Sequence, residues 1–193
     1  GVYCWPADAL PDLALAAVSA ERAAKHIKRD VVTELDEVLL LETTGETALA
    51  LSLKHGRPVV VYDHSAGDTV VLASAETTSQ AAIDKATFYF QQQGKKVLRI
   101  ADYPGLLVWR TVAMLVNEAL DALQKGVAGA EDIDTAMRLG VNYPRGPLAW
   151  GESLGWGRVL RLLENLQRHY GEERYRPCSL LRQKALMERH HEQ

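Results

Sequence analysis

The sequence predicts an α/β part followed by an all-α part, divided near residue 102. Short apolar runs alternate with helical patterns between residues 38 and 100, as they do in layered α/β folds. After the Pro104-Gly105 break these runs stop, and apolar residues recur at spacings of three and four, as in amphipathic helices. We therefore expect two domains, an α/β subdomain at 1–102 and a helical domain at 103–193.

Residues 1–37 have the weakest pattern in the chain. Apolar residues recur between 13 and 27 at helical spacing, with Asp8 or Pro11-Asp12 near the start of the expected helix. The short basic run at 25–29 is interpreted as a solvated helix face rather than a phosphate site.

Four short apolar runs after residue 37 each predict a strand, because they lack helical spacing and are bounded by turn residues. The helix after the first run ends at Gly56, and 77–79 offer N-caps for a second helix that ends at Gly94. The predicted strands cover 38–41, 59–62, 69–73 and 96–100, and the predicted helices cover 46–54 and 80–93. This alternation favours a largely parallel sheet.

The C-terminal part contains four predicted helices. The longest, 106–125, carries one broad apolar stripe. Glu131-Asp132 begin the next helix, where the helix dipole favours negative charge. Apolar stripes at 159–166 and from Ser179 onward predict the last two. Three residues of the second helix are expected to face inward: Ile133, Ala136 and Met137.

Composition excludes several classes of function. The 193 residues carry a net charge of −3, which provides no basic surface for nucleic acid or an anionic membrane. No apolar run approaches the ~20 residues that a membrane-spanning helix needs. Cys4 and Cys178 lie far apart and are interpreted as reduced thiols of a cytoplasmic protein. The chain begins Gly-Val-Tyr without a methionine, so we expect a fragment or a processed chain.

Gly151-Glu152-Ser153-Leu154-Gly155 matches the G-x-S-x-G pattern of serine hydrolases. That pattern needs a buried strand before the serine and a helix after it. Here the motif lies deep in the helical part, and no acid–histidine pair follows in a suitable arrangement. We therefore do not interpret Ser153 as a nucleophile.

Residues 38–63 imitate the start of a dinucleotide-binding fold. A strand, a turn at Gly45, a helix and a second strand end at Asp63, near the offset expected for a ribose-binding acid. The turn, however, has one glycine instead of three, and Glu46 would place a negative charge where a pyrophosphate should bind. The pattern therefore argues against a nucleotide site here.

Other polar residues also have ordinary structural interpretations. The acids Glu131, Asp132 and Asp134 are expected to cap a helix rather than bind a cation, because no oxygen-rich loop accompanies them. His190-His191 are assigned to a disordered polar tail rather than a metal site. His64 is expected in an exposed turn. An open alternative is a catalytic site that joins His64 to Asp63 or Asp68.

The second half of the chain carries motifs in a fixed order. They are Gly-Leu-Leu-Val-Trp-Arg at 105–110, Asn-Glu-Ala at 117–119, Gly-Val-Ala-Gly-Ala-Glu-Asp-Ile-Asp-Thr-Ala-Met at 126–137 before Gly140, and Pro-Arg-Gly-Pro at 144–147. Arg-Tyr-Arg-Pro at 174–177 and Leu-Leu-Arg at 180–182 follow. This series resembles the C-terminal domain of the 3-hydroxyacyl-CoA dehydrogenases over about the last 90 residues. Thr78-Ser79-Gln80 likewise resembles the start of the last helix in that family's cofactor domain.

The chain departs from this family where the chemistry should lie. The catalytic asparagine of the family falls at Trp109, which has no amide to hold a substrate carbonyl. The glutamate that orients the catalytic histidine falls near Val71, and His64 lacks the family's His-x-x-Asn-Pro context. The G-x-G-x-x-G loop is absent. We therefore expect no catalytic, cofactor-binding or metal-binding residues on this chain.

The resemblance implies a truncated Rossmann-like subdomain followed by a helical domain like the C-terminal domain of 6-phosphogluconate dehydrogenase. The tail resembles bacterial two-copy members of the 3-hydroxyadipyl-CoA dehydrogenase type, which act in phenylacetate catabolism. The longer enzyme would then oxidise a 3-hydroxyacyl-CoA to a 3-oxoacyl-CoA with NAD. This chain would be its non-catalytic C-terminal half, a scaffold, interface and wall of the acyl pocket.

The resemblance also implies partners. The expected partner is the N-terminal catalytic half of the same polypeptide or a homodimer mate, and the acyl-CoA binds in the longer enzyme. The alternative is a non-enzymatic module for dimerisation or acyl-CoA binding. Six residues are candidates for substrate or interface contacts: Arg110, Asn142, Pro144, Arg145, Pro147 and Leu148.

Overall fold

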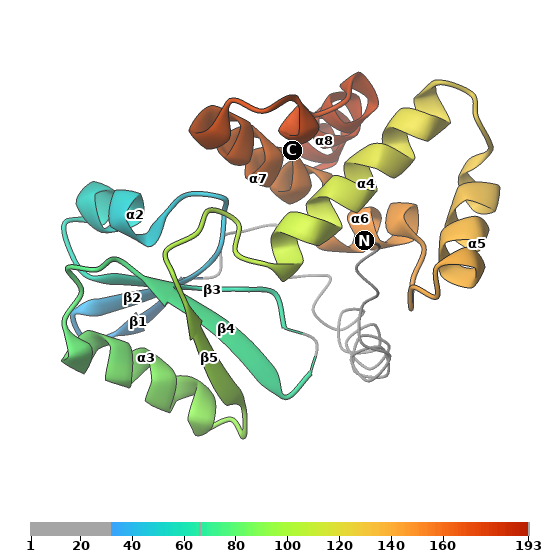
Figure 1. The fold of residues 1–193 in the computed structure, drawn as a ribbon. Helices are drawn as coiled ribbons and strands as arrows, with labels where there is room; N and C mark the ends of the chain where they lie inside the picture. Colours follow the sequence, from blue (N-terminus) through green and yellow to red (C-terminus); the bar gives the residue numbers. More distant parts are fainter. Residues whose placement is uncertain (1–31, 66, 193) are drawn as a thin grey trace.

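The computed structural model describes residues 32–65 and 67–192, and its first elements form a five-stranded sheet (Figure 1). The helix expected between 13 and 27, the basic run at 25–29 and Cys4 lie outside the described residues. The strands lie in the sheet in the order of the sequence. They are β1 (Val32–Leu35), β2 (Val38–Glu42), β3 (Val59–Tyr62), β4 (Thr69–Ser74) and β5 (Lys96–Ile100).

The sheet is mixed, so the prediction of a largely parallel sheet was wrong. β2–β3 and β4–β5 are parallel, whereas β1–β2 and β3–β4 are antiparallel. The reason is connection length, because parallel neighbours need a long crossover while antiparallel neighbours can be joined by a short turn. β1 and β2 are joined by a tight turn in which Asp36 has φ 55°. The strand pattern of β1 was missed within residues 1–37.

Two helices cover opposite faces of the sheet. α2 (Ala48–His55) connects β2 to β3, and α3 (Gln80–Gln91) connects β4 to β5. The antiparallel step from β3 to β4 reverses the strand direction, so two right-handed crossovers must place their helices on opposite faces. Leu39 and Leu41 accordingly pack with α2, while Val38 and Leu40 pack with α3. The run 38–41 is buried on both faces, as predicted.

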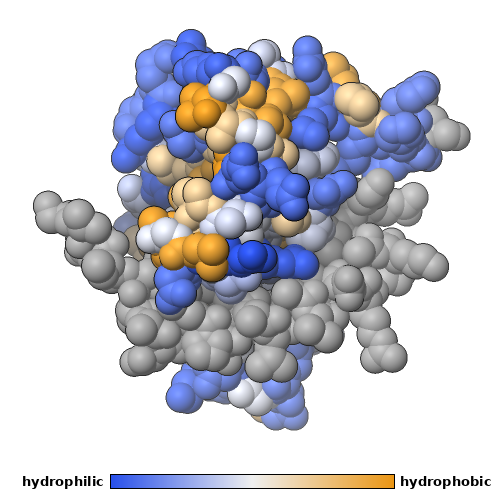
Figure 2. All heavy atoms as spheres, turned by 90° about the vertical axis from the view of Figure 1, so that its right-hand side faces the viewer, coloured by the Kyte–Doolittle hydropathy of each residue, from blue (hydrophilic) through white to orange (hydrophobic). Residues whose placement is uncertain are grey.

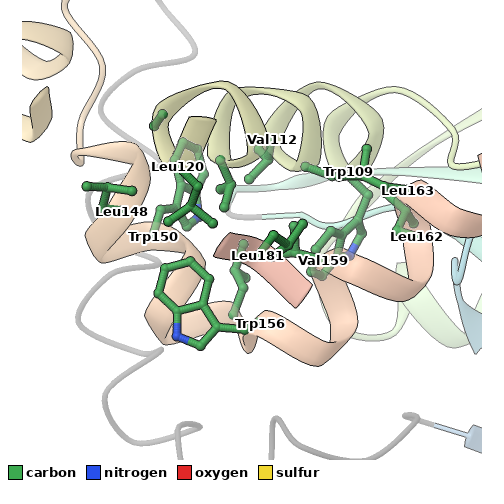
Figure 3. Packing of buried hydrophobic residues seen from close by; sticks show 14 of the residues in the cluster. Trp109, Val112, Leu120, Leu148, Trp150, Trp156, Val159, Leu162, Leu163 and Leu181 are labelled. Atoms are coloured by element: carbon green, nitrogen blue, oxygen red, sulfur yellow. The ribbon is translucent and has the colours of Figure 1, made fainter. Parts of the chain in front are cut away.

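The remaining elements form a helical part around a second core. Four helices contribute most of its buried residues, and Figure 3 shows Trp109, Val159 and Leu162 packed between α4 and α7. The short helix α6, with Pro147 in its first turn, was not predicted. The elements are α4 (Val108–Gln124), α5 (Ala130–Gly140), α6 (Pro147–Leu154), α7 (Trp156–Tyr170), the 3₁₀ turn η2 (Glu173–Tyr175) and α8 (Ser179–His191).

Helix α5 is covered less completely than expected. Ile133 is its one buried residue, Met137 is half-buried and Ala136 is exposed, so the prediction that all three face inward holds fully for Ile133 alone. Leu139 near its end is 73% exposed. The apolar stripe of α5 thus extends beyond the surface that its neighbours cover.

Four helices receive a capping carboxylate from another element. The first N–H groups of a helix have no partner within it, so an acceptor there is stabilising. Asp102 binds two N–H groups at the start of α2, and Asp134 binds two at the start of α6. Glu188 of α8 does the same for α7. The fourth carboxylate, Asp63, joins the two parts of the chain.

Asp63 follows β3 and is only 1% exposed. Its carboxylate accepts hydrogen bonds from the N–H groups of Leu107, Val108 and Trp109 at 2.7–2.9 Å, and from His64 N–H at 2.8 Å. Burial raises the pKa of the Asp63 carboxyl, and the four N–H donors oppose that rise. Asp63 therefore fixes the start of α4 against the edge of the sheet.

Replacing Asp63 with asparagine should destabilise the chain by about 3 kcal/mol, because an amide nitrogen would face buried N–H donors. The free energy of unfolding in urea, followed by circular dichroism, measures this change. The matched control is Asp68→Asn in the exposed β3–β4 loop, which should stay within about 0.5 kcal/mol of the unchanged chain. Equal stabilities for the two variants would contradict the role given to Asp63.

Candidate functional site

Four polar and aromatic side chains meet where the carboxyl ends of β2 and β3 face the helical part. We call Glu42, His64, Trp109 and Arg158 the Glu42 cluster. Glu42 ends β2 and His64 follows β3, while Trp109 and Arg158 lie in the first turns of α4 and α7. The carboxyl ends of parallel strands are the usual location of ligand sites in α/β sheets. The Glu42 cluster is therefore the candidate functional site.

Both carboxylate oxygens of Glu42 are engaged. Trp109 Nε1 donates to Oε1 at 2.7 Å, and Arg158 Nη2 binds Oε2 at 2.7 Å. His64 Nδ1 lies 3.7 Å from Oε1. The Arg158 guanidinium also lies over the Trp109 ring, 4.9 Å from its centroid. The four side chains are thus tied to one another by several contacts.

The electrostatics make Glu42 a fixed anion. Burial raises its pKa, but the neighbouring His64 imidazole, the charge of Arg158 and the hydrogen bond from Trp109 outweigh burial and lower the pKa to about 2. A carboxylate with so low a pKa is a poor proton acceptor near neutral pH. Burial and the negative charge of Glu42 raise the pKa of the neighbouring Tyr62. The cluster therefore has the properties of a buried ion pair rather than of a general base.

The alternative site that joins His64 to Asp63 or Asp68 is not formed. The carboxylate of Asp63 is occupied by backbone N–H groups of α4 and of His64 itself. Asp68 lies near Lys96, at 3.7 Å, and accepts from Thr69. The imidazole of His64 instead faces Glu42 and the edge of the Trp109 ring.

The β2–α2 loop does not fit a dinucleotide. A Cβ on Gly45 would lie 2.8 Å from the carbonyl oxygen of Leu162 and 2.9 Å from Cβ of Asn165, so the loop lies directly against α7. The first N–H groups of α2 bind Asp102 and Thr47. A pyrophosphate would need both that space and those donors. The ribose role considered for Asp63 is also excluded, because its carboxylate caps α4.

The other motifs have structural roles. Ser153 lies within α6 rather than at a strand-to-helix turn, and its hydroxyl donates to the carbonyl of Trp150. Glu131 and Asp132 lie in the first turn of α5, as predicted. His190-His191 were assigned to a disordered tail but lie in the last turn of α8. Within 32–65 and 67–192, no group of three or more His, Cys, Asp or Glu side chains could hold a metal ion.

Arg110, a predicted contact residue, lies in a cluster of tyrosines. Its guanidinium lies 4.4 Å from the ring centroid of Tyr103, 5.0 Å from that of Tyr170 and 5.2 Å from that of Tyr175. It also donates a hydrogen bond to the Tyr175 hydroxyl. Its charge is thus largely satisfied within the chain, where it ties α4 to η2.

The other predicted contact residues are grouped around the α5–α6 loop. Asn142 is exposed with φ 57°, Pro144 is partly buried, and Arg145 donates to Ser153 Oγ at 3.0 Å. Pro147 and Leu148 are buried at the start of α6, and Leu148 belongs to the helical core. The structure therefore brings three of the six candidates together on one loop.

Large apolar side chains are exposed next to this loop. Leu139 and Val141 are 73% and 56% exposed, whereas Val127, which is 74% exposed, lies at the opposite end of α5. Figure 2, which views the side of the molecule that carries α5, shows apolar residues among hydrophilic ones on this face. We call Leu139 and Val141 the α5 surface. Within the part of the chain that the structure describes, no helix is long and apolar enough to cross a membrane.

Sequence reasoning missed Glu42 and Arg158. The signal for Glu42 was a charged residue directly after the buried run 38–41, at the carboxyl end of a strand. Arg158 gave no such signal, because an arginine in an amphipathic helix normally faces solvent.

Glu42 should make stability depend on pH. Its pKa falls on folding from an ordinary value of 4.5 to about 2, so its stabilisation is complete above 4.5 and is lost as the pH falls toward 2. The expected contribution at neutral pH is about 3 kcal/mol. Urea unfolding of Glu42→Gln should show a deficit of that size at neutral pH that shrinks across this window. Exposed Glu76→Gln serves as the control, and a deficit that is independent of pH would refute the assignment.

Comparison with known proteins agrees with the resemblance seen in the sequence. Residues 105–193 match the family described as 3-hydroxyacyl-CoA dehydrogenase, C-terminal domain. Residues 40–104 match the family described as 3-hydroxybutyryl-CoA dehydrogenase reduced Rossmann-fold domain. The expected truncated Rossmann-like subdomain and helical domain are thus confirmed.

Individual relatives and a solved structure agree. The chain is 64% identical over 190 residues to 3-hydroxyadipyl-CoA dehydrogenase of Escherichia coli K12, an alignment that covers 97% of this chain and 40% of that protein. It is 31% identical to 3-hydroxybutyryl-CoA dehydrogenase of Bradyrhizobium diazoefficiens, over 91% of this chain and 64% of that protein. A crystal structure of 3-hydroxybutyryl-CoA dehydrogenase from Escherichia coli K12 matches with a TM-score of 0.83 and 69% identity, over 85% of this chain and 35% of the other.

The chain therefore spans well under half the length of its Escherichia coli relative and just under two thirds of its Bradyrhizobium relative. Its two matched regions together extend from residue 40 to 193. The chain belongs to the 3-hydroxyacyl-CoA dehydrogenase family, of which it carries a reduced Rossmann-fold domain and a C-terminal helical domain.

Proposed function

We propose that this chain is the non-catalytic C-terminal half of an NAD-dependent dehydrogenase that converts a 3-hydroxyacyl-CoA to a 3-oxoacyl-CoA. The 64% identity to 3-hydroxyadipyl-CoA dehydrogenase of Escherichia coli favours an acyl chain that ends in a free carboxylate. The half supplied by this chain acts as a scaffold, an interface and a wall of the acyl pocket. Because the substrate and cofactor are CoA and NAD metabolites, we assign the longer enzyme to the cytoplasm.

The observation that carries the proposal is the environment of Trp109. This residue stands where the family resemblance places the catalytic asparagine, yet it is 1% exposed and its indole nitrogen is bound to Glu42. Its side chain occupies the space in which a substrate carbonyl would have to meet an amide. Arg158 closes the same space from α7.

The expected base and its orienting acid are also missing from this position. Val71, where the family resemblance places the glutamate, has an aliphatic side chain and lies on β4 opposite Leu98 of β5. His64 pairs instead with Glu42, whose charge is already balanced by Arg158. In this proposal neither Val71 nor His64 takes the 3-hydroxyl proton of the substrate.

NAD belongs to the other half of the longer enzyme in this proposal. The β2–α2 loop lies against α7 at Gly45, and the N-terminal donors of α2 are bound within the chain. When bound in the catalytic half, NAD would accept the hydride from C3 of the substrate. In this proposal the residues of this chain support the catalytic half and line the acyl pocket, and they do not bind the nicotinamide.

The interface role rests on the α5 surface and the adjoining loop. The exposed apolar side chains of Leu139 and Val141 lie beside the polar Asn142 and Arg145, a mixture of apolar and polar residues that protein interfaces also have. The proposed partner is the N-terminal catalytic half of the same polypeptide, or a second copy of this chain. The same surface also favours the alternative that this chain is a non-enzymatic dimerisation module.

The chain on its own should give no turnover with acetoacetyl-CoA and NADH, because the Glu42 cluster offers neither an amide nor a free base. NADH absorbance measures the reaction, with the longer enzyme assayed alongside as the positive control. His64→Ala should leave the result unchanged. Turnover by this chain that His64→Ala abolishes would show instead a complete enzyme with a relocated site.

Leu139→Asp should weaken association with the catalytic half by about tenfold or more, because it places a charge at the centre of an apolar interface. Isothermal titration with the separately produced N-terminal half measures the affinity, and sedimentation of the chain alone tests self-association. The matched control is Leu53→Asp on α2, which replaces a leucine that is 77% exposed. If both variants associate like the unchanged chain, the α5 surface is not the interface.

A further inference from the structure

Besides apolar packing and the covalent connection, hydrogen bonds at three separate places join the described residues of the α/β part to those of the helical part. At the first, Asp63 beyond β3 binds the N–H groups that begin α4. At the second, Glu42 at the end of β2 binds both Trp109 of α4 and Arg158 of α7.

The third contact joins the β2–α2 loop to α7. Asn165 Nδ2 donates to the carbonyl oxygen of Thr44 at 2.7 Å. The backbone at Gly45 lies so close to α7 that a Cβ there would be 2.8 Å from the Leu162 carbonyl oxygen and 2.9 Å from Asn165 Cβ. Gly45 has φ 91°, so glycine allows both this conformation and the close approach.

These contacts are largely buried, so breaking them would cost free energy. The side chains of Glu42 and Arg158 are 13% and 14% exposed, so water screens their attraction only weakly. Separating α7 from the loop would leave the buried charge of Glu42 without its cationic partner, which is costly. The separation would also expose the indole of Trp109. A small rotation between the two parts would break several of these contacts together.

We propose that Glu42, Gly45, Arg158 and Asn165 form an interdomain clamp that makes the α/β part and the helical part unfold and move as one body. Two parts joined by a single connection are otherwise expected to move relative to each other, and enzymes use such hinge motion to close around a substrate. The clamp removes that freedom. This inference is independent of the proposed function, since it concerns how the chain holds itself together.

Calorimetry of the whole chain tests the clamp through cooperativity. A single body should unfold in one transition, with equal calorimetric and van't Hoff enthalpies. Gly45→Ala should force the loop from α7 and split the transition in two, or raise the ratio of calorimetric to van't Hoff enthalpy well above one. The matched control is Gly56→Ala, which replaces another left-handed glycine, with φ 66°, where a Cβ would meet nothing within 4 Å.

A second pair of variants tests the ion pair without backbone strain. Glu42→Gln should also split or broaden the transition. Glu164→Gln, which breaks the 2.7 Å ion pair between Glu164 and Arg182 inside the helical part, should lower the melting temperature of a transition that stays single. Two transitions in the unchanged chain would overturn the clamp. So would single transitions in both Gly45→Ala and Glu42→Gln.

Discussion

The buried carboxylate of Asp63 is the interaction on which the arrangement of this chain depends. It lies beyond the end of β3 and gathers four backbone N–H groups, three of them from the first residues of α4. No side chain of α4's own N-terminal residues caps the helix, because its N-cap is Leu107. A buried backbone N–H without a hydrogen-bond acceptor costs free energy. The carboxylate of Asp63 therefore holds the start of α4 against the end of β3. That position in turn places Trp109 against Glu42.

The same device recurs throughout the helical part. α6 and α7 begin at glycines that cannot cap them, and each takes a carboxylate from a distant residue, Asp134 or Glu188. These caps make the helices depend on tertiary contacts rather than on their own sequences. A close approach is needed as well, since a Cβ on Gly146 would lie within 2.6 Å of atoms of Asp134. The first turns of α6 and α7 are thus capped only when the helices that carry Asp134 and Glu188 are packed against them.

The Glu42 cluster has the properties of a packed interface rather than those of a ligand site. A site needs space, water and groups free to change protonation, whereas Glu42 has both oxygens bound and a pKa of about 2. Trp109 and Arg158 fill the space beside Glu42 with an aromatic ring and a charged group. The proposed loss of catalysis and the proposed rigidity therefore follow from the same contacts.

The sequence by itself determined the local elements and the family. The apolar runs 38–41 and 59–61 are buried, as their composition predicts, and Ser79 and Gly56 mark helix ends through their own backbone and side-chain preferences. The spaced motifs of 105–147 were sufficient to indicate the resemblance to the C-terminal domain of the 3-hydroxyacyl-CoA dehydrogenases, which the family match over residues 105–193 supports. These features depend on residues that are near one another in the chain.

Only the tertiary structure decided the directions of β1 and β4, the role of Asp63 and the partners of Glu42. Strand direction depends on which edge a short loop can reach, and that is set by the whole sheet. Asp63 resembled a ribose-binding acid in the sequence, because nothing local shows that α4, 44 residues later, needs a cap. Glu42 and Arg158 are 116 residues apart, and their pairing follows from the docking of α7 on the β2–α2 loop. Long-range charge pairing of this kind leaves no periodic signal for sequence reasoning to use.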